Sequence, residues 1–140
     1  MVPVMALLSV ACTPADGGLE TSVETAGGGG PVEVTLEEWS VAVAPASAAP
    51  GEVTFEVSNQ GSQTHNFVVF RTDLAPDQLP VESAQVVAGD GVAEVGRIDE
   101  VGPGSAERLS LSLQPGSYVL ICNVPGHYQQ GMHTAFNVES

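Results

Sequence analysis

The sequence predicts an all-β protein, a Greek-key β-sandwich of about seven or eight strands that follows a flexible N-terminal tether. Three observations support this prediction. From Pro31 onward, apolar and polar residues alternate in short runs, as in strands that bury one face. Gly and Pro interrupt these runs at turn-forming pairs. No long segment has the apolar period of a helix, and the weak exception is residues 73–79. A length of 140 residues is that of one folded domain, which we place at 31–140.

The N-terminal segment has the composition of an export signal followed by a linker. Residues 1–11 form a short apolar run ending in small residues, and Cys12 follows directly. This order resembles a bacterial lipoprotein signal, in which the cysteine becomes the lipidated first residue. The run has no basic residue and is short, so we expect a truncated start; an ordinary cleaved signal with an incidental Cys12 is the alternative. Residues 12–30, rich in Gly, Ser, Thr and Glu, are the expected flexible tether.

The strands of the domain are predicted from their alternation. In the first run the apolar parity changes between Leu36 and Trp39, and a bulge or bend at Glu37–Glu38 would account for the change. Residues 116–122 are apolar on both faces, as expected of a central strand. Clear alternation also covers three further runs, 53–58, 109–113 and 136–139.

The remaining segments are predicted to be turns and one insertion. Turn signals occur at 50–51, 61–62, 89–91, 103–104 and 115–116. The stretch 71–99 is longer than a hairpin requires. We expect an extra loop and hairpin there, at the edge of the sandwich.

The charge of the chain excludes several classes of partner. Seventeen acidic and three basic residues give a net charge of −14, and the domain alone has 14 acidic and 3 basic residues, or −11. Such a surface repels phosphate, so we expect no nucleic-acid partner and no binding to an anionic membrane face. A protein partner with a basic face, cation capture, and solubility in a saline habitat all remain compatible. We expect a monomer that meets a membrane only through a lipid anchor at Cys12.

Residues able to bind a metal gather in one C-terminal segment, CNVPGHYQQGM. It contains Cys122, His127 and Met132 at intervals of five, directly after an apolar strand. A further imidazole, His65, stands where a turn leads into another apolar strand. One thiolate, two imidazoles and a weak axial thioether are the donors of a blue copper site. Cu(I) favours soft sulfur and Cu(II) accepts imidazole nitrogen, so a rigid mixed set changes oxidation state with little movement.

These motifs resemble those of the cupredoxins, and most closely the rusticyanin and sulfocyanin type. The resemblance covers residues 31–140 and implies a type 1 copper bound by His65, Cys122, His127 and Met132. It also implies that the Asn66 N–H bonds the cysteine sulfur and that the Asn66 side chain braces the ligand loop. Asn123 and Pro125 are expected beside the ligands, where Pro125 stiffens the loop.

The predicted function is electron transfer by a protein that is not an enzyme. Single electrons would pass by outer-sphere transfer through the edge of His127, between redox partners of the cell envelope. Val124, Pro125 and Tyr128 are expected either to form an apolar rim there or to pack the loop. His133 is expected to point away from the site. We expect export to the periplasm or to the outer face of the cytoplasmic membrane.

Other functions fit the sequence less well. An envelope protein for copper storage, delivery or resistance is the main alternative, but such proteins use Met- and His-rich segments that are absent here. A Cys122–His127 hydrolase lacks a visible cationic setting to activate the thiol. Structural zinc sites rich in thiolate need more cysteines than the domain has, and no CxxCH motif for covalent haem occurs.

Overall fold

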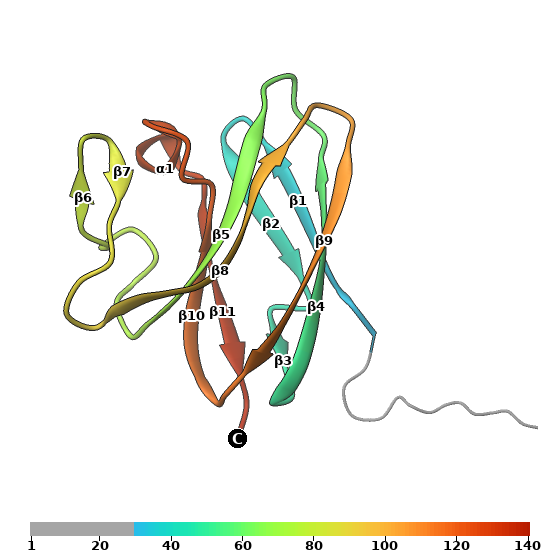
Figure 1. The fold of residues 1–140 in the computed structure, drawn as a ribbon, viewed down its shortest axis with the longest axis vertical. Helices are drawn as coiled ribbons and strands as arrows, with labels where there is room; N and C mark the ends of the chain where they lie inside the picture. The colour runs from blue at the N-terminus through green and yellow to red at the C-terminus, as the bar shows by residue number, and fades with distance from the viewer. Residues whose placement is uncertain (1–29) are drawn as a thin grey trace, which may run out of the picture.

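The computed structural model describes residues 30–140, which form two β-sheets packed face to face (Figure 1). The predicted signal segment 1–11, nearly all of the predicted tether 12–30 and the predicted lipidation site Cys12 lie outside the described residues. They remain predictions. Within the described part of the chain, no helix is long and apolar enough to cross a bilayer.

The first sheet has the strand order β2-β1-β4-β9, formed by Ser40–Ala44, Val32–Glu37, Gly51–Asn59 and Ala106–Leu113. The second has the order β3-β11-β10-β5-β8, formed by Ser47–Ala48, His133–Val138, Gly116–Ile121, His65–Thr72 and Val92–Val101. Strand β1 pairs with β4 in parallel, as β3 does with β11, and the other neighbours are antiparallel. The all-β sandwich is therefore confirmed, with more strands than the seven or eight expected.

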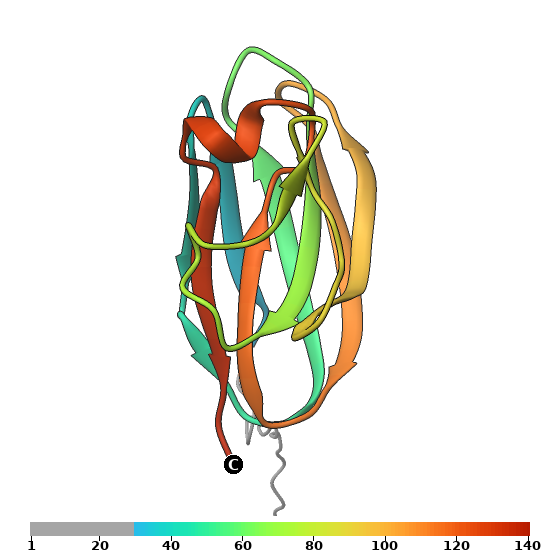
Figure 2. The same cartoon turned by 90° about the vertical axis from the view of Figure 1, so that its left-hand side faces the viewer.

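Two shorter elements lie at one end of the sandwich. They are the hairpin of β6 (Val81–Glu82) and β7 (Gln85–Val86), and the single-turn helix α1 (His127–Gln130). Figures 1 and 2 show both elements at the end away from the C-terminus. The hairpin confirms the extra hairpin expected within 71–99. The last residues of the stretch 71–99 do not belong to an insertion, however, because they form most of β8, a long edge strand of the second sheet that pairs with β5.

The predicted alternation gives a core between the two sheets. In β4, Val53, Phe55 and Val57 are buried, and the phenyl ring of Phe55 lies 5.4 Å from that of Phe67 and 5.3 Å from that of Phe136. Strand β10 is buried on both faces, as predicted for 116–122. Its Tyr118 and Leu120 join the core between the sheets, while Val119 and Ile121 pack on the outer face of the second sheet.

Residues from the stretch between β5 and β8 cover this outer face. Leu79 and Val86 are buried there against Val68 and Phe70 of β5. Strands β5 and β10 are thus enclosed on both sides, which leaves their backbones little freedom to shift.

The structure departs from two local predictions, the bulge offered with a bend at Glu37–Glu38 and the weak helix at 73–79. The parity change near Trp39 is not a bulge, because β1 ends at Glu37 and the chain reverses through Glu38–Trp39 into β2, with Glu37 paired to Ser40. This reversal explains why the apolar residues change from even-numbered to odd-numbered positions after the turn. Residues 73–79 form turns and bends instead of a helix. Pro76 removes a backbone donor in this segment, and the Leu74 N–H bonds the Thr72 side chain.

Replacing Phe55 by Ala tests the role of the aromatic core. The ring is fully buried between two other phenyl rings, so the variant should lose about 3–5 kcal/mol of unfolding free energy. Urea unfolding followed by fluorescence measures the change. The control is Leu74→Ala at an exposed position, which should change stability by less than about 0.5 kcal/mol. Equal losses in both variants would contradict this description of the core.

Candidate metal centre

Antiparallel pairing of β5 and β10 places two of the candidate ligands at the same end of the sandwich. His65 is the first residue of β5, and Cys122 directly follows the last residue of β10. From Cys122 the chain crosses this end, forms α1 with His127 as its first residue, and returns as β11. The two strands and one loop therefore bring residues 57 positions apart in sequence to one place.

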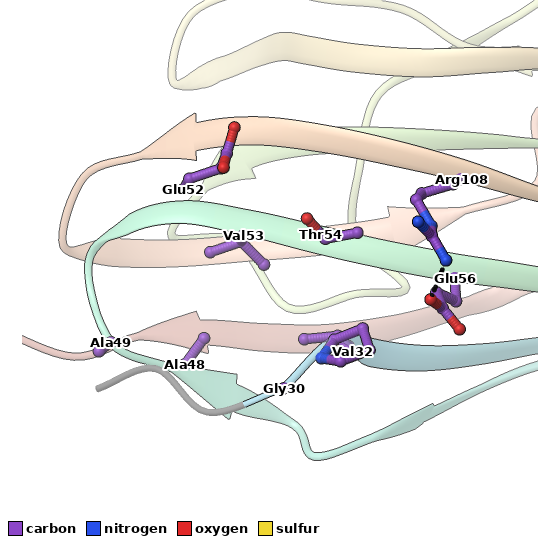
Figure 3. A pocket seen from close by; sticks show the side chains of 10 residues that line it. Gly30, Val32, Ala48, Ala49, Glu52, Val53, Thr54, Glu56 and Arg108 are labelled. Atoms are coloured by element: carbon purple, nitrogen blue, oxygen red, sulfur yellow. Dashed lines mark hydrogen bonds and ion pairs between the residues drawn. The ribbon is translucent and has the colours of Figure 1, made fainter. Parts of the chain in front are cut away.

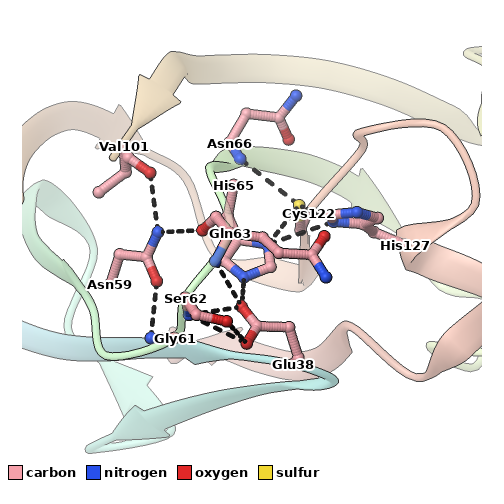
Figure 4. A network of polar contacts seen from close by, with 10 residues as sticks. All are labelled: Glu38, Asn59, Gly61, Ser62, Gln63, His65, Asn66, Val101, Cys122 and His127. Atoms are coloured by element: carbon pink, nitrogen blue, oxygen red, sulfur yellow. Dashed lines mark hydrogen bonds and ion pairs between the residues drawn. The ribbon is translucent and has the colours of Figure 1, made fainter. Parts of the chain in front are cut away.

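Three donor atoms converge there (Figure 4). The Nδ1 atoms of His65 and His127 lie 3.2 Å apart, and the Sγ of Cys122 lies 3.6 Å from the first and 3.5 Å from the second. His65 and Cys122 have no exposed surface, and His127 is 8% exposed. Over residues 30–140, no other group of His, Cys, Asp or Glu side chains converges in this way.

The spacing of the three atoms fits a metal bound between them. Bonds of about 2.0 Å to nitrogen and about 2.3 Å to sulfur, in a trigonal arrangement, separate the donors by about 3.5–3.8 Å. The observed triangle is only slightly tighter. One thiolate with two imidazoles is a borderline-soft donor set, which suits copper in both oxidation states.

Met132 is fully buried at the end of the same loop. It belongs to the core cluster that contains Cys122. Its carbonyl accepts a hydrogen bond of 3.1 Å from the Cys122 N–H, and its own N–H donates to the His127 carbonyl at 3.3 Å. These bonds close the loop on itself. His133, the next residue, is part of β11, and its ring packs 5.0 Å from Tyr128 and not among the donors.

Asn66 and Asn123 join the site to its surroundings. The Asn66 N–H lies 3.4 Å from the Cys122 Sγ, and the Asn66 side-chain oxygen accepts a bond from the Asn123 N–H. The Asn123 side chain in turn accepts from the Val86 N–H at 2.7 Å and donates to the Val86 carbonyl at 3.0 Å. The hairpin of β6 and β7 is thereby attached to the residue next to Cys122.

The turn into α1 depends on a glycine. Gly126 has a φ of 86°, a left-handed conformation that other residues adopt at a cost, and its N–H donates to the Ala84 carbonyl at 2.8 Å. The neighbouring Pro125 is exposed and Val124 half-buried. Both lie at the surface of the loop, where an apolar rim was one of the two predicted arrangements.

Tyr128 does not belong to such a rim. It is buried, and its hydroxyl donates to the Pro76 carbonyl and accepts from the Leu79 N–H. It anchors the segment that covers the second sheet. The loop-packing alternative for Tyr128 is therefore the one that the structure shows.

Two further residues lie at the site that no sequence pattern predicted. Glu38 places a carboxylate oxygen 2.7 Å from the His65 Nε2, and the ring of Trp39 meets that of His127 edge to face at 4.9 Å. Backbone bonding from Ser62, with smaller contributions from His65 and Gln63, lowers the pKa of Glu38 to about 2. The only sequence feature that marks this position is the single Trp of the chain, which stands beside the change in apolar parity.

Burial sets the protonation of the donors before a metal binds. It raises the pKa of the Cys122 thiol, and burial together with the nearby His65 lowers the pKa of His127. The thiol is therefore protonated and the His127 imidazole neutral near pH 7. A metal that binds as a thiolate complex must displace the thiol proton.

A separate surface groove of about 400 Å³ contains none of these donors (Figure 3). It lies beside Val32, Ala48 and Val53, where an ion pair of 2.6 Å joins Arg108 to Glu56. Its lining has no cysteine or histidine.

Solved structures share this fold. An auracyanin from the photosynthetic bacterium Roseiflexus castenholzii superposes with a TM-score of 0.56 at 23% identity, covering 77% of this chain and 95% of its own. Auracyanin A of Chloroflexus aurantiacus, described as a blue copper protein, gives 0.54 at 19%, covering 79% and 100%. Reduced rusticyanin gives 0.52 at 17%, covering 77% of each chain. No curated protein sequence matches the chain.

A family model decides the classification. The model of the sulfocyanin (SoxE) domain matches residues 43–140, which is most of the chain and includes all four expected ligands. The cluster of His65, Cys122 and His127, with Met132 in the same buried loop, fits one type 1 copper. The chain belongs to the sulfocyanin (SoxE) domain family of blue copper proteins, the cupredoxins.

Proposed function

We propose that this protein carries single electrons between redox partners in the cell envelope, with type 1 copper bound by His65 Nδ1, Cys122 Sγ, His127 Nδ1 and the thioether of Met132. The observation that carries the proposal is the buried triangle of one sulfur and two nitrogens, with sides of 3.2, 3.5 and 3.6 Å. The cupredoxin family supports the electron-transfer role.

Copper in such a site supplies a one-electron couple. The residues around it keep the donors in place, because strands β5 and β10 are buried on both faces and the loop is closed by backbone bonds. Donors that cannot move reduce the rearrangement that accompanies each change of charge. The same packing excludes water from His65, Cys122 and Met132, none of which has exposed surface.

Electrons have one short route to the surface. Of the four proposed ligands only His127 is exposed, at 8% of its surface. Trp39, which is 36% exposed, lies against its ring. We therefore assign the edge of His127, flanked by Trp39, as the place where electrons enter and leave.

An enzymatic role has less support than this carrier role. Copper oxidases and reductases need further imidazole clusters, and the chain has only three His, of which His133 lies outside the site. A hydrolase using Cys122 would need a lowered thiol pKa, whereas burial raises it.

Copper storage, delivery or resistance is the second candidate, and its supporting observation is the metal-binding cluster itself. Delivery proteins release metal from exposed ligands, but here the donors are buried. Colour distinguishes the two. A carrier gives an intense blue Cu(II)–thiolate band and reversible reduction, whereas delivery gives a colourless Cu(I) complex that exchanges quickly.

The position in the cell is part of the proposal. The segment 1–11, with Cys12 after it, supports export and a lipid anchor on the outer face of the cytoplasmic membrane or in the periplasm. A redox partner with a basic face would suit the charge of −11 on residues 31–140.

Replacing Cys122 by Ser should abolish the blue band, because the band arises from thiolate-to-Cu(II) charge transfer. Absorption spectra of the full chain titrated with Cu(II) measure this. Cys12→Ser removes the other cysteine and is the matched control, for which the band should be unchanged. A blue band that survives in Cys122→Ser would contradict the ligand assignment.

Replacing Met132 by Leu should keep the colour and raise the reduction potential. An apolar side chain without a donor disfavours the more highly charged oxidised ion, and a tenfold change in the ratio of Cu(II) to Cu(I) affinities corresponds to about 59 mV. Cyclic voltammetry measures the shift. Met132→Gln restores an axial donor and should reverse its direction. Identical potentials in all three proteins would exclude Met132 as a ligand.

The charge of the domain predicts opposite salt effects for small redox reagents. Salt screens the attraction between the acidic protein and a cationic ruthenium ammine, so the rate at which this reagent oxidises the reduced protein should fall as the ionic strength rises. Salt also screens the repulsion of anionic ferricyanide, so the rate of oxidation by ferricyanide should rise with ionic strength. Stopped-flow absorption at several ionic strengths measures both. Rates independent of salt for both reagents would show that the acidic surface does not steer electron-transfer partners.

A further inference from the structure

Glu38 is hydrogen-bonded to His65, a proposed copper ligand, on the ring nitrogen that faces away from the metal site. Its carboxylate lies in the turn between β1 and β2, with Oε2 2.7 Å from the Nε2 of His65. The same carboxylate accepts bonds from the Ser62 N–H at 3.0 Å, the Ser62 hydroxyl at 3.2 Å and the Gln63 N–H at 3.1 Å (Figure 4). Its side chain is 18% exposed and that of His65 fully buried.

This contact determines which nitrogen of His65 faces the metal site. A carboxylate only accepts hydrogen bonds, so the Nε2 that it touches must carry the proton. In the neutral ring, Nδ1 then has the free lone pair, and Nδ1 is the atom that lies 3.6 Å from the Cys122 sulfur. Partners on the remote nitrogen of a ligating His fix ring orientation and raise ligand basicity.

The turn that contains Glu38 also contacts the second imidazole. The ring of Trp39 packs edge to face on His127, and a side chain at Gly131 would stand 3.1 Å from the Trp39 carbonyl. A short turn far from both histidines in sequence therefore touches both rings. Its position is held by the bonds from residues 62 and 63, which come from the loop leading into β5.

We propose that Glu38 is a positioning residue of the copper centre, which keeps His65 as the Nε2–H tautomer with Nδ1 turned to the metal and uses its negative charge to favour Cu(II) over Cu(I). The tautomer is a property of the chain itself, and the effect on copper rests on the proposed function. In a purely structural role, Glu38 would only hold the loop at residues 62 and 63 in place by hydrogen bonds. Its charge would then have no effect on the reduction potential of the copper.

Three variants separate these roles. Glu38→Gln keeps an acceptor oxygen for the loop but removes the charge, and Glu38→Ala removes both. Glu37→Gln is the matched control, because Glu37 is the preceding residue, is exposed, and loses the same formal charge. Changing the partner of a ligating His typically alters metal affinity by about 10–100-fold. The ratio of Cu(II) to Cu(I) affinities should therefore fall about tenfold in Glu38→Gln, a rise of about 59 mV in potential, and by less than twofold in Glu37→Gln.

Voltammetry of the copper-loaded variants and nitrogen NMR of the metal-free chain are the two measurements. The imidazole shifts of His65 should show the Nε2–H tautomer alone in the wild type and a mixture of tautomers in Glu38→Ala. Equal potentials in Glu38→Gln and Glu37→Gln, or a neutral His65 ring with its proton on Nδ1 in the metal-free wild type, would overturn the proposal. If the wild type bound copper without blue colour, the proposed function would fail, while the NMR measurement would still decide the role of Glu38.

Discussion

The antiparallel pairing of β5 with β10 is the constraint on which the metal centre depends. It brings the start of one strand and the end of the other to the same end of the sandwich, and so places His65 beside Cys122. Both strands are buried on both faces, so neither can slide without disrupting two apolar clusters at once. The loop from Cys122 to Met132 needs only to close over this end to add the second imidazole and the thioether.

A site built in this way suits electron transfer for a physical reason. Hydrogen bonds attach the Cys122 sulfur to the backbone of Asn66, Asn66 to Asn123, and Asn123 to β7. Each of these groups is buried and paired, which holds the donors in fixed positions. Donors already in place change little when one electron is added or removed, and only the edge of His127 reaches the surface.

Much of the sandwich and of the candidate site could be predicted from the sequence, because these features depend on short-range patterns. Alternation in 53–58 and two-sided burial in 116–122 follow from strand geometry, and the spacing of Cys122, His127 and Met132 falls within one loop. The Glu38–His65 contact could not be predicted, since it joins residues 27 positions apart across two sheets. The chain reverses through Glu38–Trp39 without a bulge, and Tyr128 is buried by the covering segment, because tertiary contacts decide such positions.

Copper-edge X-ray absorption of the protein loaded with one equivalent of Cu(II) tests the central claim most directly, because it reports the atoms bound to the metal. The account predicts one short sulfur bond of about 2.2–2.3 Å together with two nitrogen bonds of about 2.0 Å. A shell of nitrogen and oxygen alone would contradict it, as would two equivalents of sulfur per metal.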